Sequence, residues 1–123
     1  MKLQPDRMDT LAVTGYGPGW IAVNGERHHG SLLITSTGLL QPWRPTSFDD
    51  LGPSDFARLT ELGVELALFG SGSRLRFVPV AWLAPLMAAR LGMETMDTPA
   101  ACRTYNILAS EGRPVAALLL GAS

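Results

Sequence analysis

The chain has 123 residues, which suits one domain, and its 46 % hydrophobic and 17 % charged residues predict a packed core rather than a disordered chain. The formal net charge is −1 and no block of like charge exists, so we expect no nucleic-acid binding, because phosphate contacts need a basic face. The single cysteine, Cys102, excludes an intrachain disulfide and a thiolate metal cluster.

The N-terminal segment of residues 1–14 carries Asp6 and Asp9 and no apolar run, so it has the features of neither a secretory signal nor a transit peptide. The apolar run at 115–120 is too short to span a bilayer. We therefore expect a cytoplasmic protein with no direct membrane insertion. Residues 1–14 are expected to form a loosely ordered lead-in to a single α/β domain over residues 15–123.

The first third of the chain predicts antiparallel strands joined by tight turns. Residues 20–23 form an apolar run, and the Asn24-Gly25 pair that follows predicts a type I′ hairpin, since both central residues of that turn need a positive φ. Further short strands are expected in the return arm of this hairpin, at 32–35 and at 39–43. This order predicts an N-terminal antiparallel meander.

Helices and strands alternate in the rest of the chain. The expected order is a helix opening at Gly52-Pro53, a strand at 64–69, a short extended piece at 75–78, a helix at 82–91, a strand at 93–96, a helix from Thr98 to Glu111 and a strand at 115–120. Short links between these elements imply parallel strands with right-handed crossovers, a β-α-β-α-β unit. We predict an α/β fold, a single three-layer domain with a mixed sheet and about three helices.

One candidate ligand site follows a strand of this unit. Backbone N–H groups in a loop such as Gly70-Ser71-Gly72 can hold a phosphate or carboxylate. The third glycine of a dinucleotide fingerprint and the lysine of a P-loop are missing, so a tight strand exit is the competing interpretation. Asp97 and Thr98 are expected at the same edge of the sheet, where open α/β sheets bind ligands.

Asp97 and Thr98 also have a structural interpretation. Thr98 followed by Pro99 predicts a helix N-cap and first helical residue. A carboxylate at Asp97 would interact favourably with the positive end of the same helix. Capping is therefore expected here, and a ligand would be an addition to it.

A polar stripe is expected on the helix that begins at Thr98. Arg103, Asn106 and Ser110 fall within about 60° of one another at 100° per residue. The stripe is a solvated face, a contact face, or a means of holding Arg103 against Asp97. Arg103 and Asn106, together with Tyr105 on the core-facing side, are the candidate interaction or pocket-lining residues.

No complete catalytic or metal-binding set is visible in the sequence. Cys102 lies near a helix N-terminus, which can lower the pKa of a thiol, but a nucleophile also needs a base. His28 and His29 lie far away in the predicted hairpin, and adjacent residues of a strand point to opposite faces. We expect no catalytic residue, no metal and no cofactor, with Cys102 as a small packing residue.

Several short motifs, spread over nearly the whole chain from Tyr16 onward, show a family resemblance. The most specific ones are Gly70-Ser71-Gly72, Met96-Asp97-Thr98, Arg103-Thr104-Tyr105-Asn106 and Glu111-Gly112-Arg113. On these motifs the chain resembles a family of small single-domain proteins of unknown biochemical activity, related to the mitochondrial assembly factor 3 of respiratory complex I. The family's loop usually contains threonine where this chain has Ser71. The resemblance implies a three-layer α/β domain with a mixed sheet, and no established substrate or cofactor.

The leading functional prediction is a non-enzymatic binding or assembly-assisting protein. Its expected partner is a protein, such as a subunit of a membrane complex, and the sequence does not indicate the oligomeric state. The alternative is a small domain that binds an anionic ligand through the Gly70–Gly72 loop and the Asp97/Thr98 strand end. A third hypothesis, an enzyme that depends on Cys102, ranks below both.

Overall fold

The N-terminal third folds into a three-stranded antiparallel sheet in the computed structural model, which describes residues 10–121. Its strands are β1 (Val13–Gly17), β2 (Trp20–Val23) and β3 (Glu26–His29), paired in that order. Between β2 and β3, Asn24 and Gly25 have φ angles of 50° and 87°, the positive values that the predicted hairpin requires. Strand β1 begins inside the segment expected to be a loosely ordered lead-in, and residues 1–9 lie outside the described residues.

The second sheet is mixed and has five strands in the order β5-β4-β8-β6-β7. They are β4 (Leu32–Thr35), β5 (Leu40–Pro42), β6 (Leu66–Gly70), β7 (Gly92–Met96) and β8 (Val115–Leu119). Strand β4 is antiparallel to β5 and β8, whereas β6 is parallel to both β7 and β8. The predicted β-α-β-α-β unit is therefore confirmed, and the N-terminal meander is divided between the two sheets.

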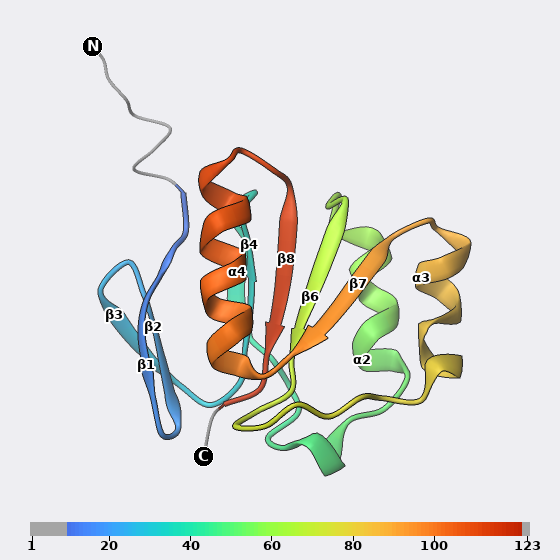
Figure 1. The fold of residues 1–123 in the computed structure, drawn as a ribbon, viewed down its shortest axis with the longest axis horizontal. Coiled ribbons are helices and arrows are strands. Elements are labelled where there is room, and N and C mark those ends of the chain that lie inside the picture. Colours follow the sequence, from blue (N-terminus) through green and yellow to red (C-terminus); the bar gives the residue numbers. More distant parts are fainter. Residues whose placement is uncertain (1–9, 122–123) are drawn as a thin grey trace.

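The molecule has three layers. Helix α4 (Thr98–Ser110) and the three-stranded sheet lie on one face of the mixed sheet, and α2 (Ser54–Ala57) and α3 (Ala84–Ala88) lie on the other (Figure 1). These are the three α-helices of residues 10–121, and short 3-10 turns accompany them. The three-layer α/β architecture predicted from the sequence is confirmed.

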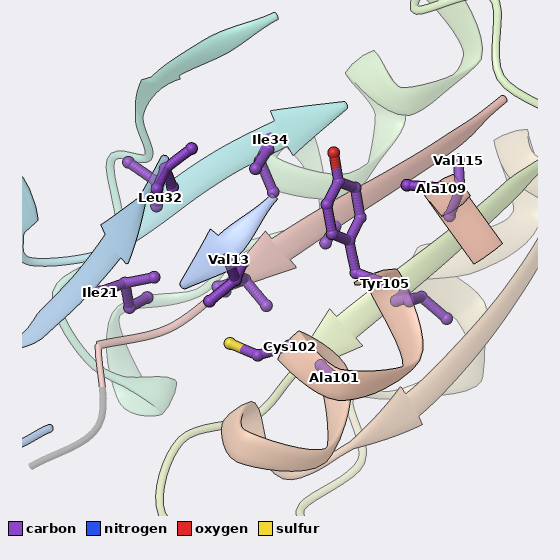
Figure 2. Packing of buried hydrophobic residues seen from close by; sticks show 13 residues of the cluster. Val13, Ile21, Leu32, Ile34, Ala101, Cys102, Tyr105, Ala109 and Val115 are labelled. Carbon is purple, nitrogen blue, oxygen red and sulfur yellow. The ribbon is translucent and has the colours of Figure 1, made fainter. Parts of the chain in front are cut away.

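Strand β8 separates two hydrophobic cores. Val115, Ala117 and Leu119 pack on the side of α4, in the core shown in Figure 2, and Ala116 and Leu118 pack on the side of α2 and α3. Every residue of β8 is buried, which confirms the prediction that its continuous apolar run is covered on both faces. The C-terminal half of the chain thus places a fully buried strand at the centre of the fold.

Two predicted helices are shorter than expected. The helix predicted to open at Gly52-Pro53 is the single turn α2 followed by a 3-10 turn at Arg58–Glu61. The helix predicted at 82–91 is a 3-10 turn at Val80–Leu83 followed by α3, because Pro85 is accommodated only near the start of an α-helix. Residues 75–78 form no strand.

Candidate functional site

The predicted glycine loop and the start of α4 are packed backbone against backbone. Gly70, the last residue of β6, is buried, and a Cβ built on it would lie 3.0 Å from both Cα and Oγ1 of Thr98. It would also lie 3.2 Å from Cβ of Ala101. Only glycine fits this crossing without displacing the helix. The structure therefore brings the two halves of the predicted anion site together.

The hydroxyl of Thr98 joins three parts of the chain. Its Oγ1 accepts a hydrogen bond from the backbone N–H of Gly72 at 2.9 Å and donates to the carbonyl of Leu120 at 2.8 Å. The backbone N–H of Thr98 donates to the carbonyl of Gly72 at 2.8 Å. Thr98 is fully buried, so these bonds tie the loop after β6 and the end of β8 to the first turn of α4.

The predicted N-cap at Thr98 is wrong by one residue. Asp97 is the N-cap, and its Oδ1 accepts the backbone N–H of Ala100 at 2.8 Å. Thr98 is the first helical residue, and its hydroxyl is already engaged by the loop and by β8. The cap therefore falls on the preceding carboxylate, which remains near the surface.

Ser71 organises the loop that follows Gly70. Its hydroxyl donates to the carbonyl of Arg74 at 2.7 Å and accepts the backbone N–H of Arg76 at 3.0 Å. Its own N–H donates to the carbonyl of Met96 at 2.9 Å. The Gly72 N–H is likewise bonded to Thr98. The Ser71 hydroxyl and the N–H groups of Ser71 and Gly72, which were predicted to bind an anion, are therefore all hydrogen-bonded within the protein.

The candidate interaction residues of α4 bind the N-terminal sheet. Asn106 pairs with both backbone groups of Val13: its Oδ1 accepts the N–H at 2.9 Å, and its Nδ2 donates to the carbonyl at 2.7 Å. Tyr105, which is fully buried, donates from its hydroxyl to the carbonyl of Leu11 at 2.8 Å. Nη1 of Arg103 lies 3.0 Å from the hydroxyl oxygen of Tyr16. The polar stripe is thus an intramolecular contact face over these residues.

The hypothesised pairing of Arg103 with Asp97 does not occur among residues 10–121. Arg103 binds Tyr16 and Asp97 caps α4. Ser110, the last member of the stripe, is exposed and donates to the carbonyl of Ile107 in its own helix. The stripe therefore divides into a part that contacts β1 and a solvated end.

Asn106 and Ser110 also border a hollow of about 400 Å³. Its described lining is completed by Thr10, Leu11, Ala12, Ala109 and Gly112. None of these residues is charged, so the lining offers no ionic contact for an anion or a metal ion.

Cys102 is a buried packing residue. It is 1 % exposed, and burial raises the pKa of its thiol to about 12. Burial likewise raises the pKa of Tyr105 above its ordinary value. At neutral pH the Cys102 thiol is protonated, which removes the nucleophile that a thiol enzyme needs.

No metal centre is visible in the part of the chain that the structure describes, where no three His, Cys, Asp or Glu side chains are grouped to hold an ion. Over the same residues, each helix is too short or too polar to cross a bilayer.

An exposed apolar segment was missed as a candidate site. Leu75, Phe77 and Val80 lie between β6 and α3 and are 51 %, 69 % and 68 % exposed. Val78, in the same segment, is buried. We call residues 75–80 the apolar segment. The sequence predicted only a short extended piece here, because the alternation of apolar residues does not show which side is covered.

The chain matches the family described as "Protein of unknown function (DUF498/DUF598)" over residues 13–120. It belongs to this family. The match covers both sheets, α4 and the glycine loop.

Curated relatives include an uncharacterized protein of Rhodobacter capsulatus, 40 % identical over 119 residues, which cover 95 % of this chain and 90 % of that protein. The human NADH dehydrogenase [ubiquinone] 1 alpha subcomplex assembly factor 3 is 28 % identical over 120 residues, which cover 96 % of this chain. The chain spans 65 % of the length of that human protein.

A solved structure shows the same fold. The crystal structure of a Bordetella parapertussis protein superimposes with a TM-score of 0.85 at 36 % sequence identity. The match covers 91 % of this chain and 96 % of that one. The mixed α/β architecture is therefore shared with an experimentally determined structure.

Proposed function

We propose that this protein is a non-enzymatic, cytoplasmic binding protein that assists the assembly of a membrane complex by contacting one of its subunits. The relatives named as NADH dehydrogenase assembly factors support an assembly role. The protonated Cys102 thiol supports a role without covalent catalysis. The observation that carries the proposal is the exposed apolar segment.

Three large apolar side chains of this segment lie at the surface within six residues of sequence. Leu75, Phe77 and Val80 are each more than half exposed. Val78 is buried between them in the core that also contains Leu86 of α3, so the segment is anchored to the fold. Contiguous apolar patches on a protein surface mark sites of protein contact, and we propose that these three side chains form such a patch.

The size of this surface suits a temporary partner. Three side chains bury less than the roughly 800 Å² per partner of a standard stable interface. A subunit that still exposes apolar surface before its incorporation matches these side chains chemically, and it can leave when the finished complex covers that surface. We therefore place the contact on the apolar segment. Arg103, Tyr105 and Asn106 hold the N-terminal sheet instead.

The proposal is tested by complementation in cells that lack the protein. The double variant Phe77→Ser/Val80→Ser removes the apolar contact, and Ile107→Ser is the matched control. Ile107 is 58 % exposed on α4, which packs on the opposite face of the mixed sheet. The amount of assembled NADH dehydrogenase is measured on native gels, and the fold of each variant is checked by thermal unfolding.

We expect the deletion to lower the amount of assembled complex, and wild type and Ile107→Ser to restore it. Phe77→Ser/Val80→Ser should fail to restore it while unfolding at nearly the wild-type temperature, since exposed substitutions change stability by about 0.5 kcal/mol or less. An unchanged complex in the deletion strain would contradict the assembly role. Full rescue by the double variant would contradict the place of the contact.

A further inference from the structure

A small basic pocket lies beside the glycine loop. It has a volume of about 150 Å³ and is bordered by residues 46–48, residues 71–74, Arg76 and residues 120–121. Asp97 and Thr98 do not line it. The pocket therefore differs from the anion site predicted on those residues, although it shares the Ser71–Gly72 wall.

The described residues only partly compensate the charge of the two arginines in this pocket. The guanidinium of Arg74 has no carboxylate partner among residues 10–121, and its side chain is exposed. Nη2 of Arg76 lies 3.4 Å from Oδ1 of Asp49, whose side chain is 87 % exposed. Such an exposed pair is weak. Asp50, which binds the pocket residue Thr46 through its backbone N–H, is also engaged by Arg44.

Residues with neutral donors also line the pocket. The hydroxyls of Ser47 and Ser73 have no hydrogen-bond partner within the described chain. The backbone N–H groups of Ser73 and Arg74 are likewise unpaired there. Hydroxyls, N–H groups and guanidinium forks are the donors with which proteins bind carboxylates and phosphates.

The pocket is held in shape without a ligand. The buried hydroxyl of Ser71 bridges the carbonyl of Arg74 and the N–H of Arg76, which fixes the turn that carries both arginines. The guanidinium of Arg76 lies 4.1 Å from the ring centroid of Phe48. Less conformational freedom is then lost when an anion binds.

We propose that this pocket, the Arg74 pocket, binds a single oxyanion group, a carboxylate or a phosphate. Its volume is below the roughly 300 Å³ at which pockets for whole small molecules begin, which favours one anionic group over a nucleotide. Arg74 and Arg76 supply the charge, and Ser47 and Ser73 supply neutral donors. Ser71 is a positioning residue.

The test is an NMR titration of the purified protein, so its outcome does not depend on the assembly role. Backbone amide shifts are followed with inorganic phosphate, with succinate and with sodium chloride at matched ionic strength. Arg74→Gln removes the positive charge of Arg74. Arg90→Asn is the matched control, because it removes one positive charge at the end of α3, where the φ of 57° is one that asparagine tolerates.

We expect saturable shifts at the amides of Ser47, Ser73, Arg74 and Arg76 with phosphate or succinate but not with chloride. Comparison of the two anions identifies which oxyanion is preferred. Arg74→Gln should weaken binding by about tenfold or more, the usual worth of a charged hydrogen bond, and Arg90→Asn should leave it unchanged.

The same spectra report the fold of each variant, and Arg74→Lys supplies a second test because it keeps the charge. It should bind more tightly than Arg74→Gln. Shifts that are equally large with chloride, or that grow without saturation over all basic surfaces, would overturn the site. Equal affinities of wild type and Arg74→Gln would also overturn it.

Discussion

Asn106 of α4 forms two hydrogen bonds with the backbone of a single residue, Val13 of β1. The carboxamide oxygen accepts the Val13 N–H at 2.9 Å, and the carboxamide nitrogen donates to the Val13 carbonyl at 2.7 Å. Val13 starts the strand that begins the three-stranded sheet. Val13 is paired with Val23 of β2, and Asn106 binds its backbone at the open edge of β1, which links the three-stranded sheet to α4.

Asn106→Ala should loosen the three-stranded sheet. Loss of both bonds leaves the partly buried N–H and carbonyl of Val13 without partners, which is expected to lower the free energy of unfolding by about 1–3 kcal/mol. Hydrogen exchange at Val13 should accelerate more than exchange in β8. Ser110→Ala, an exposed change one turn further along α4, should alter neither quantity. Wild-type protection of Val13 in Asn106→Ala would contradict the role given to this contact.

Thr98→Val should destabilise the junction between the glycine loop, α4 and β8. Valine has nearly the shape of threonine, but it leaves the Gly72 N–H and the Leu120 carbonyl unpaired in a buried site. The expected loss is about 2–4 kcal/mol, measured by urea unfolding. Thr104→Val, on the same helix and without a side-chain hydrogen bond to residues 10–121, is the matched control. Equal midpoints for the two variants would refute the prediction.

Gly70→Ala should be poorly tolerated. The new methyl would lie 3.0 Å from backbone Cα of Thr98, so α4 or β6 must move, at a cost of about 1–3 kcal/mol. The same change at Gly92 would meet only Cδ1 of Leu66 at 3.6 Å, an ordinary contact. Thermal unfolding should therefore separate the two variants, with only Gly70→Ala shifted strongly downward. If both unfold together, the close crossing is not the reason for this glycine.

Stability should fall at high pH because Cys102 is buried. Its pKa is raised from 9.0 in the ordinary thiol to about 12 in the fold, so the folded state holds this proton more tightly than the unfolded chain. The contribution of the protonated Cys102 thiol to the free energy of unfolding is fully present below pH 9.0, and it is lost as the pH rises towards about 12. Tyr105, whose pKa burial also raises, adds a loss above its ordinary value of 10.0.

Urea unfolding as a function of pH measures this effect. Cys102→Ala should show a shallower fall in stability from pH 9 upward, with the remaining slope due in part to Tyr105. Its absolute stability will differ because a buried side chain has been shortened, so the slopes are the quantities to compare. Identical slopes in wild type and Cys102→Ala would contradict a buried, protonated thiol.

Local patterns in the sequence were sufficient for the main elements. The apolar run of β8, the Asn24-Gly25 turn and the alternation of helices and strands after residue 50 all predict structure that forms. These signals depend on neighbouring residues, whose preferences are present in the chain before it folds. The lengths of α2 and α3 were misjudged, because short helices depend on tertiary packing more than on local propensity.

For the candidate site, the sequence identified the residues but not their hydrogen-bond partners. The sequence identified Gly70–Gly72, Thr98, Arg103, Tyr105 and Asn106 as residues with unusual polar or conformational properties. It could not show that their partners are Leu120, Tyr16, Leu11 and Val13, which lie more than 20 positions away from them. For example, the amide of Asn106 has the same chemistry in a solvated stripe as in a contact with β1, and only the fold decides between them.

The apolar segment and the Arg74 pocket both depend on how distant segments of the chain pack together. The alternation of Leu75, Arg76, Phe77 and Val78 is visible in the sequence, but which side chains become buried depends on the core beneath α3. Residues 46–48 approach residues 71–76 only when the strands are assembled. The order and type of the elements can be predicted from the sequence, because they follow local preferences. Tertiary structure alone decided which polar groups are satisfied internally and which surfaces remain free to bind, because both depend on contacts between distant segments.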